Sequence, residues 1–186
     1  MDRRDLTYPS FLVDATNHLH RVPTGRQLNP FRRFHIFSTV LTRPGTEAEF
    51  NALAHGLLSG AVHRTAGAAL AEYSAHSTDR IGPGDVVTVT FCGLKAPCLV
   101  LEAGVRNKKD RKRDAEALVA RLTYGTLPGH MECGEEYFEL TYREGVLTAR
   151  VVAFSRAGRW FTRLGGPAAR TVQRLMARRY ARALLR

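Results

Sequence analysis

The strongest constraint on the fold is the order of the predicted elements along the chain. Between residues 86 and 154, segments rich in β-branched and aromatic residues alternate with turns, which is the pattern of consecutive strands. Strands that follow one another through short turns pair antiparallel. We therefore expect an antiparallel sheet built from strands at residues 31–42, 86–92, 97–103, 121–124, 136–142 and 146–154.

Two helical segments flank this run of strands. Thr46 and Glu49 have the spacing of a capping box, which predicts a helix that begins there and continues, bent or as two helices, to about Ser74. The last segment follows Gly165-Gly166-Pro167, and Pro167 suits the first turn of a helix. The resulting order indicates an α+β design with helices on one side of the sheet.

The charge of the chain is uneven. The formal net charge is +11, from 28 Lys and Arg against 17 Asp and Glu. Nine arginines lie in residues 156–186, which hold no acidic residue, and a second basic group lies at residues 106–113. Such a charge invites a nucleic-acid or anionic-membrane partner. No zinc-finger spacing or RNP-like aromatic motif accompanies it, so a nucleic-acid partner is not the favoured interpretation.

The composition excludes several other classes of protein. The hydrophobic content of 44% is that of a globular protein, and no window is apolar enough for a transmembrane span. The first residues lead into no secretory signal, and the three cysteines make no disulfide framework. We therefore expect one domain over residues 1–186, with residues 1–30 as an arm packed on it, and a cytoplasmic location.

The most specific motif lies at residues 124–136. It reads Tyr-Gly-Thr-Leu-Pro-Gly-His from Tyr124 to His130, followed by Glu132 and by Gly134-Glu135-Glu136. Together with residues 153–156 and 163–167, it resembles the signature of the domain-of-unknown-function 1990 family, over nearly the whole chain. That family is placed among START-like, helix-grip proteins. The resemblance implies a curved antiparallel sheet wrapped on a long C-terminal helix, with an internal cavity between them, and it implies no particular reaction.

Strand alternation predicts which carboxylate of this motif faces the core. On residues 136–142, the face that holds Glu136 and Phe138 is more apolar than the face that holds Glu135. Glu136 is therefore predicted to point inward, where a carboxylate needs a cation or hydrogen-bond donors, or its pKa rises. Either result suits a binding site or acid–base chemistry. The alternative is a carboxylate with a purely structural pairing.

The C-terminal helix is predicted to bury an apolar face made of Ala168, Val172, Leu175, Met176, Tyr180, Ala183 and Leu184. Arg179 falls near the middle of that face. It is therefore predicted to point into the grip, with Glu136 as its first candidate partner. The arginines Arg170, Arg174, Arg178 and Arg182 recur every four residues on another face, which is interpreted as a solvated surface.

Further residues complete the predicted site. His130 is a candidate acid–base or ligand-binding residue, or else a hydrogen-bonding residue of a surface turn. The hydroxyls of Tyr8, Tyr124 and Tyr180 are expected to line the mouth of the cavity. Glu132 and Arg156 are also expected to contact the ligand.

No metal and no cofactor are expected. Residues 130–133 include His, Glu and Cys, but they lack the paired spacing of zinc ligands. The chain contains neither a Gly-rich phosphate loop nor a nucleophile elbow.

Three functions follow from these patterns. The favoured one is the binding of an apolar or amphipathic small molecule in a helix-grip cavity. The alternative is a biosynthetic enzyme, such as a cyclase, dehydratase or isomerase, with His130 and Glu136 as catalytic acid and base. The third is an adaptor for nucleic acid or membrane that uses the arginines of the C-terminal helix. The oligomeric state stays open.

Overall fold

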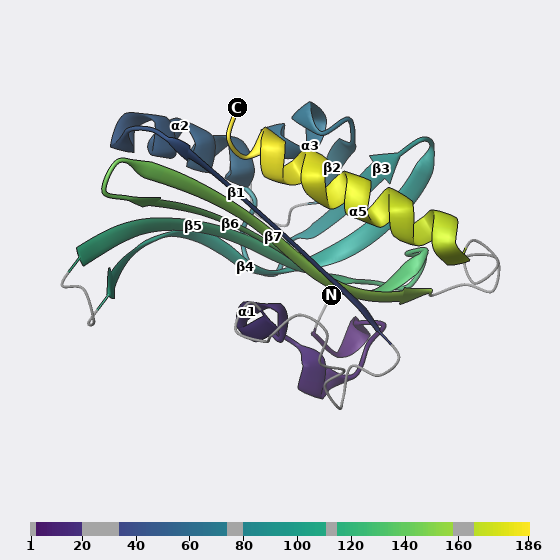
Figure 1. The fold of residues 1–186 in the computed structure, drawn as a ribbon. Helices are drawn as coiled ribbons and strands as arrows, with labels where there is room; N and C mark the ends of the chain where they lie inside the picture. Colours follow the sequence, from purple (N-terminus) through teal and green to yellow (C-terminus); the bar gives the residue numbers. More distant parts are fainter. Residues whose placement is uncertain (1–2, 20–33, 74–79, 111–114, 158–165) are drawn as a thin grey trace.

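The computed structural model describes residues 3–19, 34–73, 80–110, 115–157 and 166–186. Seven strands form one antiparallel sheet in the order β1-β7-β6-β5-β4-β3-β2. They are β1 His35–Pro44, β2 Ala69–Tyr73, β3 Val86–Phe91, β4 Leu94–Asp110, β5 Ala115–Thr126, β6 Glu132–Arg143 and β7 Val146–Ala157. The sheet curves beneath the C-terminal helix α5, Gly166–Ala183 (Figure 1). The predicted helix-grip fold class is confirmed.

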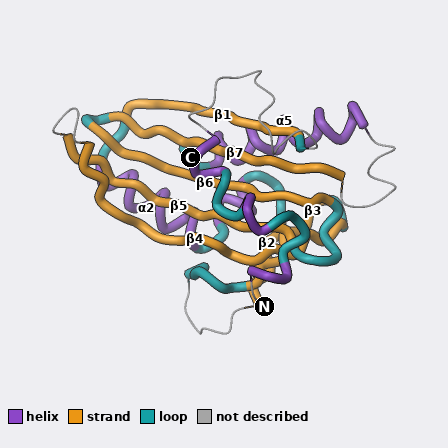
Figure 2. Tube along the Cα trace, turned by 90° about the horizontal axis from the view of Figure 1, so that it is seen from below, coloured by secondary structure: helices purple, strands orange, loops and turns teal. Residues whose placement is uncertain are grey.

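The helices divide between the two faces of the sheet. Helices α2 (Glu47–Leu58), α3 (Ala61–Thr65) and α5 cover one face, which we call the concave face (Figure 1). The short helix α1 (Thr16–Leu19) and two single-turn segments, Arg3–Asp5 and Ser10–Leu12, lie across the opposite, convex face (Figure 2). Among the described residues, no helix is long and apolar enough to cross a membrane.

Each face carries its own apolar cluster. The larger cluster packs the concave face against α2, α3 and α5, and it includes Phe50, Leu57, Phe138 and Leu184. The smaller cluster packs the N-terminal segment on the convex face, and its buried members are Tyr8, Leu12, Leu19, Cys133, Tyr137, Val152 and Phe154. The start of β6 is therefore covered on both sides, which places its polar side chains in buried surroundings.

The first helical segment is shorter than predicted. The capping box is confirmed, because the Thr46 side chain accepts the N–H of Glu49 while the Glu49 side chain accepts the N–H of Thr46. The helix then breaks at Gly60, whose φ is 73°. The prediction of helix to about Ser74 is wrong, because Ala69–Tyr73 forms strand β2 and pairs with β3. Pairing at the sheet edge here overrides the helical preference of an Ala-rich segment.

Strands β4, β5, β6 and β7 are all longer than predicted, and the extensions of β4 and β6 change the interpretation of the sequence. β4 continues to Asp110, so the first part of the basic group at residues 106–113 is strand and not the tip of a loop. Residues 111–114 lie outside the described residues. β6 begins at Glu132, because this end of the strand pairs with the last residues of β7. The motif residues 132–136 therefore belong to the sheet.

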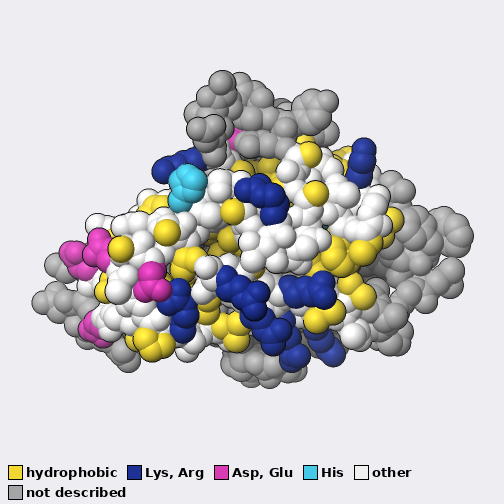
Figure 3. All heavy atoms as spheres, turned by 90° about the horizontal axis from the view of Figure 1, so that it is seen from above, with side chains coloured by type: hydrophobic (Ala, Val, Ile, Leu, Met, Phe, Trp, Pro, Cys, Tyr) yellow, Lys and Arg dark blue, Asp and Glu magenta, His cyan; other side chains and the backbone are white. Residues whose placement is uncertain are grey.

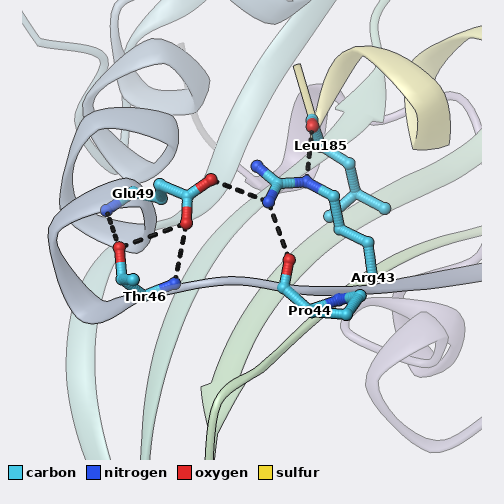
Figure 4. A network of polar contacts seen from close by, with 5 residues as sticks. All are labelled: Arg43, Pro44, Thr46, Glu49 and Leu185. Atoms are coloured by element: carbon cyan, nitrogen blue, oxygen red, sulfur yellow. Dashed lines mark hydrogen bonds and ion pairs between the residues drawn. The ribbon is translucent and has the colours of Figure 1, made fainter.

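Arg43 fixes the end of α5 against the rest of the fold (Figure 4). Its Nε donates to the carbonyl of Leu185 at 2.9 Å, just beyond the C-terminus of the helix. Its Nη1 donates to Oε1 of Glu49 and to the carbonyl of Pro44, each at 2.8 Å. The guanidinium thus joins the end of β1, the first turn of α2 and the end of α5, which sets the position of α5 over the sheet.

The buried carboxylate of Glu135 accepts several hydrogen bonds from the N-terminal segment, which also pairs with Thr126 through Thr7. Glu135 is only 2% exposed. Its Oε2 accepts the Tyr8 hydroxyl at 2.8 Å and the Asp14 N–H at 2.9 Å. Its Oε1 accepts the Thr16 N–H at 3.1 Å and also the Thr16 hydroxyl. Burial raises the pKa of Glu135, and these donors act in the opposite direction.

The described part of the predicted arm is therefore residues 3–19, packed on the sheet; residues 20–30 lie outside the described residues. The organisation of residues 1–186 as a single domain stays a prediction.

Glu135→Gln should release this segment. The variant keeps the size of the side chain, but its amide NH₂ is a donor. It would therefore face the N–H and O–H donors that now bind one carboxylate oxygen of Glu135. Leaving buried donors without an acceptor costs on the order of 2–3 kcal/mol. We expect urea unfolding to show a loss of about that size in the free energy of unfolding, with faster amide exchange in residues 8–16. Glu144→Gln, at an exposed turn, is the control and should change neither. Equal stability of the two variants would contradict the anchoring role of Glu135.

Candidate functional site

A pocket of about 200 Å³ lies on the concave face between the sheet and α5. Its apolar lining includes Phe37, Phe91, Ala153, Val172, Met176 and Ala177. Its polar lining includes Tyr124, Thr126, His130, Glu132, Glu136, Ser155, Gln173 and Tyr180. Strands β1, β3, β5, β6 and β7 contribute, so the pocket is built from residues far apart in the sequence.

Glu136 is turned into the pocket, as strand alternation predicts. Tyr124 lies opposite it on β5, and the Tyr124 hydroxyl donates to Oε2 of Glu136 at 3.0 Å. Burial raises the pKa of Glu136 to about 7, and the nearby Glu132 acts in the same direction, while the Tyr124 donor opposes both. Near neutral pH, Glu136 therefore exchanges between carboxylate and carboxylic acid.

A second carboxylate, Glu132, lies at the same end of the pocket. The Gln173 amide on α5 donates to Oε1 of Glu132, and it also donates to the Ser155 hydroxyl at 3.0 Å. Burial raises the pKa of Glu132, and the hydrogen bonds from Gln173 and Ser155 oppose this rise. Glu132 and Glu136 are four residues apart on β6, so alternation turns both toward the concave face.

The tautomer of His130 follows from its hydrogen bond. The backbone N–H of Glu132 donates to Nδ1 of His130 at 2.9 Å, so Nδ1 is the acceptor and the ring proton of the neutral form lies on Nε2. Burial lowers the pKa of His130 to about 4. The ring is therefore neutral at physiological pH and offers one N–H donor at the pocket wall.

His63 lies behind the pocket and was not among the predicted site residues. It comes from α3, is 0% exposed, and places Nε2 at 3.4 Å from the Tyr124 hydroxyl. Burial lowers its pKa to about 4, so the ring is neutral. His63, Tyr124 and Glu136 thus form a polar chain from the core to the pocket. In the sequence, the position of His63 close to the apolar residues Val62 and Ala66 could have indicated that it is buried. The periodicity of a helix does not predict which residue a buried histidine contacts.

Two of the three glycines of the motif allow close packing around the site. A Cβ on Gly125 would lie 2.4 Å from the Tyr8 hydroxyl, and a Cβ on Gly134 would lie 1.9 Å from the carbonyl oxygen of Phe154. Neither approach is compatible with a side chain. The motif therefore combines residues that face the pocket with residues that allow close packing.

Two predicted ligand-binding residues lie on the wrong side of the sheet. Tyr8 packs on the convex face and donates to Glu135, and Arg156 places its guanidinium 5.1 Å from the ring centroid of Phe34 with its Nε toward Sγ of Cys133. Neither lines the pocket. The predicted position of both residues at the cavity is wrong, because alternation and chain packing place them on the opposite face of the sheet.

The predicted inward position of Arg179 is also wrong. Its side chain is exposed, and it lines a separate surface hollow with Arg182 and Arg186. The helix buries Ala177, Tyr180, Ala181 and Leu184, and Arg179 lies opposite these at about 100° per residue. The prediction centred the buried face on Val172 and Leu175, which are 48% and 47% exposed. Ala177 and Ala181, together with Tyr180 and Leu184, form the buried face that packs α5 on the sheet.

The outer side of α5 is basic. Arg174, Arg178, Arg179 and Arg182 are all exposed, and Lys and Arg side chains gather on the face seen from above (Figure 3). The side chain of Arg170 lies outside the described residues. Within the described part of the chain, no group of three or more His, Cys, Asp or Glu side chains is arranged to hold a metal ion.

The raised pKa of Glu136 predicts how its removal affects stability. The pKa of Glu136 is about 7 in the folded protein, above the ordinary value of 4.5. Between pH 4.5 and pH 7, the folded state therefore holds a proton that the unfolded state has released. Wild type therefore loses stability as pH rises through this window, whereas Glu136→Gln does not titrate. From pH 5 to pH 8, the variant should gain on the order of 2 kcal/mol relative to wild type in urea unfolding. A difference independent of pH would show that a counter-charge stabilises the carboxylate.

Comparison with known proteins places the chain in a family. The family model described as domain of unknown function (DUF1990) matches residues 16–183. A UPF0548 protein of Deinococcus radiodurans is 45% identical over 64 residues, which cover 34% of this chain and 32% of that protein. The chain thus spans about a third of the length of the curated relative that it matches.

Two solved structures match the chain, and the first of them shows similarity of fold. The crystal structure of the hypothetical protein jhp0584 from Helicobacter pylori has a TM-score of 0.58 and 9% identity, and the match covers 88% of this chain and 95% of that one. Truncated norcoclaurine synthase from Thalictrum flavum has a TM-score of 0.45 and 10% identity, with coverage of 82% and 94%. The match over residues 16–183 spans most of the sequence. The chain therefore belongs to the DUF1990 family.

Proposed function

We propose that this protein binds a small apolar or amphipathic molecule in the pocket between α5 and the sheet. The observation that supports this most is the composition of the pocket wall, in which aromatic and aliphatic side chains are combined with a few polar groups at one end. An apolar cavity of about 150 Å³ accommodates benzene. A pocket of about 200 Å³ is therefore suited to a molecule of about one ring with a short polar substituent.

The electrostatics of the pocket agree with a binding role. From the residues that the structure describes, Glu136 receives one hydrogen bond, whereas Glu135 on the opposite face receives four. Buried polar groups in stable cores are hydrogen-bonded, and an incompletely satisfied group at a pocket wall is available to a ligand. The outer arginines of α5 are exposed to solvent and do not take part.

Native mass spectrometry tests the proposal directly. The protein should be purified without denaturation from more than one expression host and examined for a bound small molecule that is lost on unfolding. A ligand of the size of the pocket supports the proposal. Its consistent absence, together with no binding in a panel of one-ring compounds, would contradict it.

Filling the pocket should abolish binding. Ala153 lies on β7 at the pocket wall, opposite Phe37 on β1. Ala153→Leu places three additional carbon atoms in the cavity, and we expect at least a tenfold loss of ligand affinity by calorimetry with an unchanged circular dichroism spectrum. Ala71→Leu is the matched control: it makes the same change at an exposed position of β2, away from the pocket. Equal loss in both variants, or no loss in Ala153→Leu, would place the ligand elsewhere.

An enzyme is the second candidate, and one observation favours it. A carboxyl group with a pKa of about 7 is suited to both donating and accepting a proton at physiological pH, and Glu136 is such a group. The Nε2–H of His130 lies at the same pocket and can donate to a substrate oxygen.

The enzyme candidate is tested on the ligand that copurifies. It should be incubated with wild type and with Glu136→Gln, and the products should be analysed by liquid chromatography and mass spectrometry. Conversion by wild type, with a loss of at least 100-fold in kcat when the variant is saturated with ligand, is the expected result for an acid–base catalyst. Recovery of unchanged ligand from wild type would leave binding alone as the function.

A further inference from the structure

In the pocket, most hydrogen-bond donors already bind other groups of the protein, whereas several acceptors do not. The Tyr124 hydroxyl donates to Glu136, and the Gln173 amide donates to Glu132 and Ser155. Nδ1 of His130 is occupied by the N–H of Glu132. Most donors at this end are thus used within the protein, and the oxygen atoms of the two carboxylates and of Gln173 outnumber the two remaining donors, which are the N–H of His130 and the hydroxyl of Tyr180. The remaining capacity is mainly that of an acceptor.

The charge of the pocket is equally one-sided. Among the described residues, the lining includes no Lys or Arg and three glutamates. Glu132 and Glu136 face the cavity, whereas the carboxylate of Glu135 binds the N-terminal segment on the convex face. Arg156 lies on the convex face and Arg179 on the outer side of α5, so neither approaches Glu136. Buried carboxylates are normally paired with a cation. In this part of the chain, such a partner is missing at Glu136.

The other titratable groups around Glu136 do not supply positive charge. Burial raises the pKa of Tyr124, Tyr180 and Cys98, so all three are neutral at physiological pH. Burial lowers the pKa values of His63 and His130 to about 4, so both are also neutral. Glu132 is the remaining neighbour, and it is acidic.

We propose that the ligand of this pocket carries a protonated amine on a small apolar body, with the ammonium group placed between Glu132 and Glu136. This inference rests on the proposed binding function and specifies its ligand class. The ammonium group offers three N–H donors and a positive charge, which match the acceptors and the missing cation. The body of the ligand packs on the aromatic and aliphatic wall.

Three probes of matched shape test the inference: 3-phenylpropylamine, 3-phenylpropan-1-ol and 3-phenylpropanoic acid. At pH 8, calorimetry should show the amine binding at least tenfold more tightly than the alcohol, and the acid binding most weakly. An alkylammonium stays protonated below about pH 10. Glu136 has a pKa of about 7, so its ionised fraction falls about tenfold from pH 8 to pH 6, and amine affinity should fall with it. Alcohol affinity should stay within about twofold.

Variants separate the charge from the pocket shape. Glu136→Gln should lower the ratio of amine affinity to alcohol affinity at least tenfold and should abolish the dependence of amine binding on pH. Glu144→Gln removes a carboxylate from an exposed turn with the same change in net charge, and it should bind the amine as wild type does.

The outcomes distinguish this inference from the proposed function. If the alcohol binds as tightly as the amine, or if amine affinity does not change between pH 6 and pH 8, the pocket binds ligands but does not select a cation. If none of the probes binds and no ligand copurifies, the binding function itself is contradicted. If the acid binds most tightly, the pocket contains a positive charge and the inference is wrong.

Discussion

Two consecutive carboxylates on β6 face opposite sides of the sheet, and the rest of the structure depends on this alternation. In the register observed, Gly125 lies opposite Glu135 and Tyr124 lies opposite Glu136. Gly125 leaves the space in which Tyr8 reaches Glu135, while Tyr124 supplies the donor to Glu136. A shift of β6 by one residue would exchange the faces of both carboxylates. The register therefore fixes the attachment of the N-terminal segment and the polar end of the pocket together.

The two carboxylates differ in how completely the protein satisfies them. Glu135 receives four donors, which is the environment of a group that stabilises the fold. Among the described residues, Glu136 receives one donor and has an acidic neighbour, Glu132. Burial and this neighbour raise the pKa of Glu136 to about 7. Such an arrangement is unfavourable for stability alone. It is understandable when the missing partner is a ligand.

Helix α5 keeps its arginines on the outer surface and packs its apolar residues on the sheet. Ala177 and Ala181 allow the helix to approach the sheet closely, and Arg43 fixes its C-terminal end through Leu185. The arginines of this segment lie on the outer surface, so much of the net charge of +11 is at positions that do not contact the pocket. The basic composition and the acidic pocket therefore coexist in one small structure. Whether the basic surface has a partner of its own is a separate question from what the pocket binds.

The sequence by itself determined the elements that depend on local pattern: six of the seven strands, the capping box at Thr46, the inward position of Glu136 and the family motif. Alternation has a period of two, so a single apolar neighbour such as Phe138 is enough to orient a strand residue. Tertiary structure alone decided the places of Tyr8, Arg156, Arg179 and His63, and turned residues 69–73 into a strand. The rotation of a helix and the face that an arm covers depend on close packing with distant segments, which local periodicity does not record.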